Sequence, residues 1–490
     1  MPVAKARKWD AASGFTFITF SHPDQVLERG TQTTIRSKAL SSVSRPKKKK
    51  LPRPVVLDLE MLQNQPATCG TDLTEFAHEL EVVRFCRALE LQVIPPALPH
   101  LGIFAVEPDY RARELLTFMS NEAKHVYRPF RTEWFNMAIL SSTSYYLCLA
   151  NAALFLDQHA TGSNTLEYTD SIESTRYYSK CLTQVNKQLA SSAEDIDGGT
   201  ITTILGFICH SLATRNYEKC EMHMHGLERI ISLRGGFHGL GDLLTIFASW
   251  FDITNAAFHD TAPRLPCPTM LDEDSSRSEP LSPALAPLFW ESQEAHLDPS
   301  LWAISMIKLR QLAARINNNS TQPQFWDSGI KSTKILGPVA HCILSIPRLD
   351  ITISSSRDIV NPTIALREAT RLALLVLMAL LKRAFSLIAD ELHSLLEKLW
   401  TVTPLLATIS CFPGLRLWIS FVHACAIEEP ISELQLANIH RAMRELDISR
   451  GSQAFCEAEK VIWIHCLLDD RARPVQEQID RYLADNQYIL

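Results

Sequence analysis

The sequence lacks the short cysteine spacings that metal sites and redox motifs need. It holds twelve cysteines among 490 residues, but no Cys-x-x-Cys pair, and the closest pairs are Cys456/Cys466 and Cys209/Cys220. Structural zinc sites and thioredoxin-like motifs are therefore excluded. Thiols scattered along a chain of this length suit a reducing compartment better than a disulfide framework. We expect neither a metal nor a cofactor.

Long apolar runs are also missing. The longest covers residues 372–381 and is bounded by Arg371 and Lys382. A membrane-spanning helix needs about 20 apolar residues, so this run predicts a buried core helix instead. The charged residues near the start of the chain are not followed by an apolar stretch of the kind found in secretory signals. We expect no membrane partner.

The sequence has none of the common catalytic motifs, such as G-x-S-x-G, H-E-x-x-H or a Walker phosphate loop. His223 and His225 are two positions apart, which places their side chains on roughly opposite faces of a helix, so they cannot share a metal ion. Cys209 and His210 are adjacent and also diverge on a helix, and no third group that would orient them is apparent. The sequence therefore predicts a protein that is not an enzyme.

Charge is distributed unevenly along the chain. Residues 1–53 carry twelve lysines and arginines against three acidic residues, a net charge of +9, so the remainder must carry −15 of the overall −6. A basic arm ahead of an acidic body indicates two separate roles. The arm suits an acidic partner, whereas the body is not expected to bind DNA along its own surface.

Within the arm, one basic run is interrupted by prolines, which keep it extended and accessible. One interpretation is a nuclear import signal that binds an import receptor, and a second is weak, non-specific contact with nucleic-acid phosphates. A solvated linker without a receptor is the third. The run consists of Arg45, Lys47, Lys48, Lys49, Lys50 and Arg53.

From about residue 71, apolar residues recur at spacings of three and four, as on the buried faces of helices, and signals for strands are few. The sequence predicts an all-α protein, with a single large, irregular helical domain (71–490) behind a disordered basic arm (1–70). A stretch at 261–287, rich in proline, serine and acidic residues, predicts an exposed loop inserted in the helical body.

The stretch from Tyr217 to Gly236 combines a helical pattern with a marked end. Gly235 and Gly236 follow the last turn, where glycine readily takes the left-handed capping conformation. Gly226 inside the helix costs about 1 kcal/mol relative to alanine, and a closely packed neighbouring helix would offset that cost. Four apolar residues recur at spacings of four, three and four and share one face. They are Cys220, Met224, Leu227 and Ile231.

The end of this stretch, HMHGLERIISLRGG, resembles the HM-x-GL-x-x-(M/I)(V/I)-x-LRGG signature of the second family of fungal-specific transcription-factor domains, the regulatory middle domain of fungal zinc-cluster factors. The likeness continues through Trp250, Asp252, Ala256 and the Pro-Arg-Leu-Pro run at 263–266. Shorter likenesses lie in the arm, in residues 414–424 and at Trp463.

The resemblance implies a nuclear regulator of transcription whose partners are the transcription machinery or a DNA-bound protein. It implies structural roles for the signature: Gly226 permits close helix contact, Gly235 and Gly236 end the helix, and Arg234 ties the helix to an acidic partner within the body. The signature residues are Gly226, Leu227, Arg234, Gly235, Gly236, Trp250 and Asp252.

The sequence departs from the full family pattern in its N-terminal region. Zinc-cluster factors read DNA with six closely spaced cysteines ahead of a basic linker, but residues 1–68 contain no cysteine. That device is therefore excluded in this part of the chain. A second hypothesis stays open: a helical protein-interaction scaffold or co-regulator that makes no direct contact with DNA.

Overall fold

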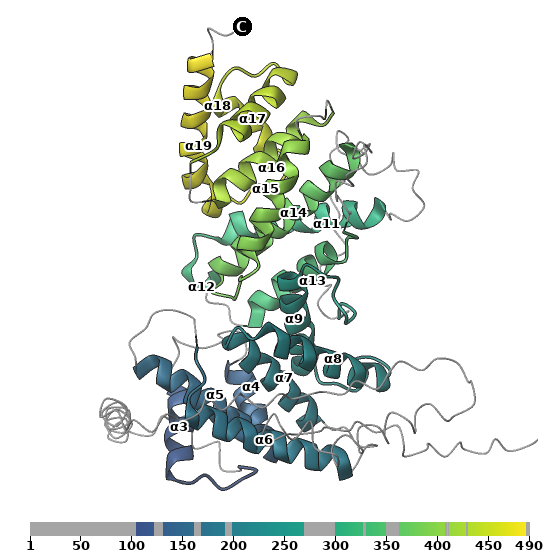
Figure 1. The fold of residues 1–490 in the computed structure, drawn as a ribbon, viewed down its shortest axis with the longest axis vertical. Helices are drawn as coiled ribbons and strands as arrows, with labels where there is room; N and C mark the ends of the chain where they lie inside the picture. The colour runs from purple at the N-terminus through teal and green to yellow at the C-terminus, as the bar shows by residue number, and fades with distance from the viewer. Residues whose placement is uncertain are drawn as a thin grey trace, which may run out of the picture. The chain divides into compact units, whose positions relative to one another are not determined.

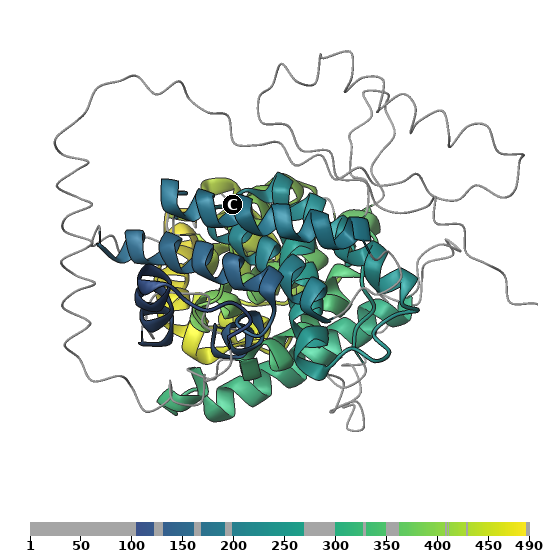
Figure 2. The same ribbon diagram turned by 90° about the horizontal axis from the view of Figure 1, so that it is seen from below.

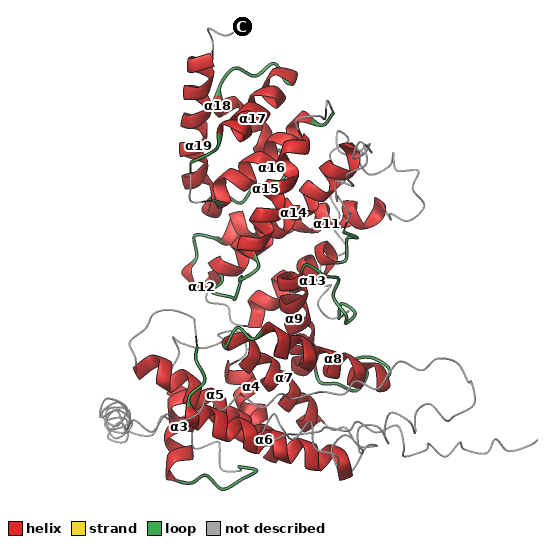
Figure 3. Cartoon of the chain, viewed as in Figure 1, coloured by secondary structure: helices red, strands yellow, loops and turns green. Residues whose placement is uncertain are grey.

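The computed structural model describes residues 104–121, 131–160, 168–191, 198–268, 299–326, 330–348, 362–406, 409, 411–427 and 430–486. Within these ranges every regular element is a helix and there is no strand (Figure 3). The prediction of an all-α protein is confirmed. The basic arm at 1–70, residues 71–103, and residues 269–287 of the predicted loop lie outside the described residues.

The chain divides into two compact units, with the boundary inside helix α9 (Asp242–His259), after Leu244. In the first unit α5 packs against α3, α4, α6 and α7, and α7 also packs against α8. Helices α5 and α6 lie side by side in both ribbon views (Figures 1 and 2). The helices are α3 (Tyr110–Asn121), α4 (Arg131–Ala138), α5 (Ser142–Ala160), α6 (Ile172–Ser191), α7 (Gly198–Ala213) and α8 (Tyr217–Leu233).

Apolar stripes visible in the sequence form the core of this unit. Tyr178, Cys181, Leu182 and Val185 recur along one face of α6 and are buried against α5 and α7. Burying side chains of this size removes apolar surface from water, which contributes roughly 1.5–3 kcal/mol for each large residue. The packing of α6 therefore follows directly from its 3.6-residue period.

One close contact in the first unit depends on a glycine. A Cβ atom added to Gly206 of α7 would lie 2.6 Å from the ring of Trp134 on α4 and 2.7 Å from Leu147 on α5. Real Cβ atoms do not approach other atoms so closely, so only glycine lets these three helices pack as they do.

In the second unit α14 packs against α13, α15 and α16, and α16 packs in turn against α17, α18 and α19. Every residue of the apolar run 372–381 is buried in α14, which confirms the predicted core helix. After α9 the described helices are α11 (Pro299–Asn319), α12 (Pro323–Trp326), α13 (Ile330–Leu344), α14 (Pro362–Ala384), α15 (Leu392–Leu406), α16 (Pro413–Ala426), α17 (Glu433–Glu445), α18 (Gly451–Glu459) and α19 (His465–Asn486).

Candidate functional site

Helix α8 carries the first part of the signature. It begins after Asn216, whose side chain accepts a hydrogen bond from the backbone N–H of Lys219 at 3.0 Å. Leu227 is fully buried, and Gly226 is buried beside it. That a neighbouring helix packs closely against Gly226 stays a prediction.

The structure places the end of α8 at Leu233. Gly235 has φ +78° and Gly236 has φ +101°. The N–H of Gly236 donates to the carbonyl of Ile231 at 2.9 Å, and that of Gly235 donates to Ser232 at 3.1 Å. These two bonds and the left-handed Gly235 make a Schellman motif, which satisfies carbonyls that the helix itself leaves without partners.

Arg234 is the residue between α8 and this motif. Its backbone keeps a right-handed conformation with φ −77°, and its side chain is half-buried. The guanidinium lies beside Gly239, 3.9 Å from where a Cβ of that residue would be. The acidic partner expected for Arg234 stays a prediction.

The histidines of α8 lie on different faces. His223 is buried, stacks on the ring of Phe207 with the centroids 5.1 Å apart, and lies 3.3 Å from the hydroxyl of Tyr178. Burial lowers the pKa of His223 to about 3, so its ring is neutral at pH 7. His225 is half exposed, and its Nε2 lies 3.3 Å from Glu221. The two imidazoles do not share a site.

A buried polar centre of the first unit surrounds His210 of α7. Its Nδ1 lies 2.8 Å from Asn151 Oδ1 on α5, and its Nε2 lies 2.8 Å from Asp170 Oδ1, just before α6. Burial alone would raise the pKa of Asp170, but the hydrogen bond and charge of His210, with the charge of Lys219, lower it below its usual value. The group ties α5 and α7 to the segment that leads into α6.

The sequence interpretation missed this orienting pair, because Asp170 precedes His210 by forty positions and no local pattern links them. Even so, the neighbouring Cys209 is not an activated nucleophile. Burial raises the pKa of its thiol to about 12, which keeps it protonated, whereas a reactive cysteine needs a lowered pKa.

The second part of the signature lies in the second unit. Trp250 and Asp252 are both buried on α9. Asp252 Oδ2 accepts the backbone N–H of Leu265 at 2.8 Å, and the carbonyl of Leu265 is 2.9 Å from Nε2 of His341 on α13. Leu265 belongs to the Pro-Arg-Leu-Pro run at 263–266, and Asp252 belongs to the signature on α9. This hydrogen bond therefore joins two segments that carry the resemblance described above. The run is thereby held between α9 and α13.

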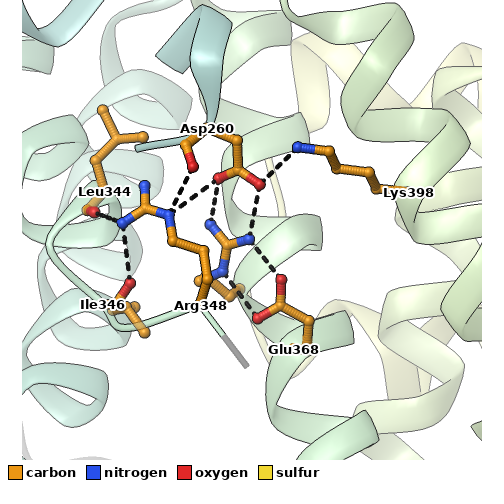
Figure 4. A network of polar contacts seen from close by, with 7 residues as sticks. Asp260, Leu344, Ile346, Arg348, Glu368 and Lys398 are labelled. Atoms are coloured by element: carbon orange, nitrogen blue, oxygen red, sulfur yellow. Dashed lines mark hydrogen bonds and ion pairs between the residues drawn. The ribbon is translucent and has the colours of Figure 1, made fainter. Parts of the chain in front are cut away.

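A network of charges surrounds Asp260, immediately after α9 (Figure 4). Arg371 of α14 donates to both carboxylate oxygens of Asp260, at 2.7 and 3.0 Å, and to Glu368 through Nε and Nη2 at 3.0 and 2.5 Å. Lys398 of α15 donates to Asp260 Oδ2 at 2.9 Å, and Arg348 Nε donates to the Asp260 carbonyl at 2.8 Å. The network thus connects the ends of α9 and α13 to α14 and α15.

The charges in this network stabilise one another. Burial alone would raise the pKa of Asp260, but the hydrogen bonds and charges of Arg371 and Lys398 hold it far below its usual range. The Arg371 side chain is only 1% exposed, so its charge has been removed from water at a cost in free energy. The ion pairs with its two carboxylate partners offset that cost. In the sequence, Arg371 and Lys382 stand at the two ends of the apolar run 372–381. Both are buried, and Lys382 pairs with Glu391 at 2.6 Å.

Within the described residues no group of three histidine, cysteine or acidic side chains is arranged to hold a metal ion. Of the described helices, none combines the length and the apolar character needed to cross a membrane. The basic run Arg45, Lys47–Lys50 and Arg53 lies outside the described residues. Its role as an import signal or phosphate contact stays a prediction.

The buried polar centres fasten helices to one another in an all-α protein. In a comparison with protein families, the fungal specific transcription factor domain matches residues 114–462, well over half of the chain. The chain belongs to this family, which is not a family of enzymes. No significant match was found among curated proteins or among solved structures.

Proposed function

We propose that this protein regulates transcription in the nucleus, and that its helical domain acts through protein contacts rather than through a zinc-cluster DNA reader. The family match over residues 114–462 carries the proposal. The net charge of −15 outside the first 53 residues supports it, because an acidic body is a poor surface for DNA phosphates. The basic run serves import in this proposal.

The nuclear part is tested by imaging the tagged full chain in a fungal cell. Replacing Lys47, Lys48, Lys49 and Lys50 by glutamine should move the protein to the cytoplasm, because an import receptor binds the positive charges. A matched control replaces Lys5, Arg7, Lys8 and Arg29 by glutamine, which removes the same four charges from the arm but leaves the run intact. This control should stay nuclear. A wild-type protein that is cytoplasmic would contradict the proposal.

The regulatory part is tested by chromatin occupancy and by transcript levels after deletion of the gene. A regulator should occupy defined regions and alter the transcripts of neighbouring genes. Unchanged transcripts, together with no occupancy above background, would contradict it.

The co-regulator hypothesis makes a separate prediction. The four-lysine variant is given an unrelated import signal, so that it enters the nucleus without its own basic run. Occupancy that survives in this variant indicates a protein partner on DNA. Occupancy that is lost while the protein remains nuclear indicates that the run itself contacts phosphates, and such contact should weaken steeply with salt.

A further inference from the structure

Helices α11 and α13 of the second unit form a positively charged part of a body that is otherwise acidic. From Pro299 at the start of α11 to Leu349, the chain holds six lysines and arginines and one acidic residue, Asp327. Outside the first 53 residues the chain as a whole has a net charge of −15. Protein surfaces usually intersperse charges of both signs, so this concentration of cations points to a partner of opposite charge.

The two helices pack against each other and run in opposite directions. The hydroxyl of Ser305, in the first half of α11, donates to the sulfur of Cys342, near the end of α13, at 3.2 Å. Because only the short connection 320–329 joins the helices, the last turns of α11 lie beside the first turns of α13. Arg315 of α11 is therefore at the same end of the pair as Lys331 and Lys334 of α13.

Four side chains of this pair make up what we term the cationic face. Arg315, Lys331 and Lys334 are exposed to solvent. Lys308 precedes Arg315 by seven positions, or about two turns, so both lie on one side of α11. Burial lowers the pKa of His341 on α13, and the charge of Lys308 lowers it further, so Lys308 also lies near α13. The cationic face consists of Lys308, Arg315, Lys331 and Lys334.

An exposed apolar side chain extends the cationic face and favours a protein as the partner. Ile304 precedes Lys308 by four positions, about one turn of α11, and is 43% exposed. A phosphate backbone has no apolar group to cover it, whereas a protein segment can supply one. The acidic body also repels a nucleic acid, whose charge is dense and continuous, more strongly than it repels a short acidic peptide.

We infer that the cationic face and Ile304 bind an acidic segment of a partner protein, with carboxylates against the four cations and an aliphatic side chain over Ile304. The inference deepens the proposed function, on which it rests for the existence of a protein partner, by naming the surface that the partner contacts. Its test measures binding between purified molecules. A failure there is distinct from a failure of nuclear import or of transcriptional control.

The test uses the purified full chain and a synthetic peptide of about 15 residues, which spans about 22 Å as a helix. The peptide has glutamates three and four positions apart, a central leucine and a neutral dye, and its binding is followed by fluorescence anisotropy. It should bind saturably, and more weakly as salt is added. A peptide with glutamine in place of every glutamate should not bind. No saturable binding of the acidic peptide, or equal binding of both peptides, would overturn the inference.

A triple variant locates the site on the chain. Arg315→Gln, Lys331→Gln and Lys334→Gln together should weaken binding by about tenfold or more, because three exposed ion pairs are lost. The matched control replaces three exposed cations of α6 by glutamine and should bind as the wild type does. Equal loss in the two variants would show that only net charge matters, which would overturn the inference. The control positions are Arg176, Lys180 and Lys187.

Two further measurements test the chemistry of the partner. Ile304→Gln should weaken binding of the leucine peptide but leave a peptide with alanine in place of leucine unaffected, and equal effects on both would overturn the apolar contact. A DNA duplex of random sequence, added at equal concentration of charge, should displace little of the acidic peptide. Full displacement by the duplex would assign the cationic face to nucleic acid and overturn the inference. The far-UV circular dichroism of every variant is compared with that of the wild type.

Discussion

Arg371 holds both carboxylate oxygens of Asp260 in a two-pronged contact across 111 positions of sequence. The guanidinium is buried between this carboxylate and that of Glu368, and the Asp260 backbone has a left-handed φ of +50°. This φ belongs to a Schellman cap, because the N–H of Thr261 donates to the carbonyl of Ala256 at 2.9 Å and that of Asp260 to Ala257 at 3.2 Å. The residue that ends α9 is thus also the one that the Arg371 ion pair ties to α14.

Removing the Asp260 carboxylate should destabilise the second unit. Asp260→Ala leaves Arg371 with one carboxylate in place of two, and breaking a buried pair costs about 3–5 kcal/mol. The control is Lys398→Ala, because Lys398 contacts the same carboxylate but its side chain is 45% exposed, and its loss should cost no more than about 1 kcal/mol.

Urea unfolding followed by tryptophan fluorescence measures both variants of this network. All described tryptophans except Trp134 belong to the second unit, so the signal reports mainly on it. Equal midpoints for Asp260→Ala and Lys398→Ala would show that the Arg371 contact contributes nothing beyond a surface pair.

Buried histidines make the protein sensitive to acid. Burial lowers the pKa of His423 to about 4, compared with about 6.5 in an unfolded chain, so between these values the unfolded state binds more protons. The contribution of His423 to stability is therefore full above about pH 6.5 and is lost as the pH falls toward 4, by up to about 1.4 kcal/mol per pH unit. His223 adds the same dependence to the first unit.

His423→Gln tests this origin of the acid sensitivity. Glutamine does not titrate, and its side-chain oxygen can accept the hydrogen bond that Gln435 Nε2 makes to His423 Nδ1 at 2.7 Å. The free energy of unfolding is measured in urea between pH 5 and pH 7. In this range the histidine takes up a proton in the unfolded chain but stays neutral in the folded protein. The slope with pH should be smaller in the variant. An unchanged slope would assign the acid sensitivity to other groups.

The sequence predicted those features that depend on local order along the chain. The apolar stripe of α6, the buried helix at 372–381 and the all-α class follow from the 3.6-residue period, which needs no knowledge of what packs against it. The partners of Arg371 and His210 could not be predicted in this way. Asp260 lies 111 positions from Arg371, and Asp170 lies 40 positions from His210. A charged side chain next to an apolar run is expected at the protein surface unless a buried partner of opposite charge is known.

Gly206 should be intolerant of even one added methyl group. In Gly206→Ala the new Cβ would lie 2.6 Å from the Trp134 ring, and overpacking of this kind costs about 1–3 kcal/mol. Gly414→Ala is the control, because a Cβ there meets nothing within 4 Å and alanine is the better helix former. Thermal unfolding followed by circular dichroism should show a lower midpoint for the first variant only. A midpoint equal to that of the wild type would mean that the three helices separate at little cost.

Gly235 should be needed for its backbone conformation rather than for space. A Cβ on Gly235 meets nothing within 4 Å, but its φ of +78° costs an ordinary residue about 1–2 kcal/mol. Gly235→Ala should lose about this much stability, and Gly235→Asn less, because asparagine tolerates the left-handed region. The matched control is Gly241→Ala, which also faces open space and lacks a positive φ. Equal unfolding midpoints for the two alanine variants would contradict the strain argument.

Asp252 should hold the Pro-Arg-Leu-Pro run against the second unit. Asp252→Leu leaves the buried N–H of Leu265 without its acceptor, which costs about 1–3 kcal/mol, whereas Asp252→Asn keeps an acceptor oxygen at the same place. Hydrogen exchange at the Leu265 amide, measured by mass spectrometry, reports this contact directly. Exchange should become faster in the leucine variant by about tenfold or more and change little in the asparagine variant. If both variants exchange as slowly as the wild type, the run is held by packing of the Leu265 side chain and the hydrogen bond is incidental.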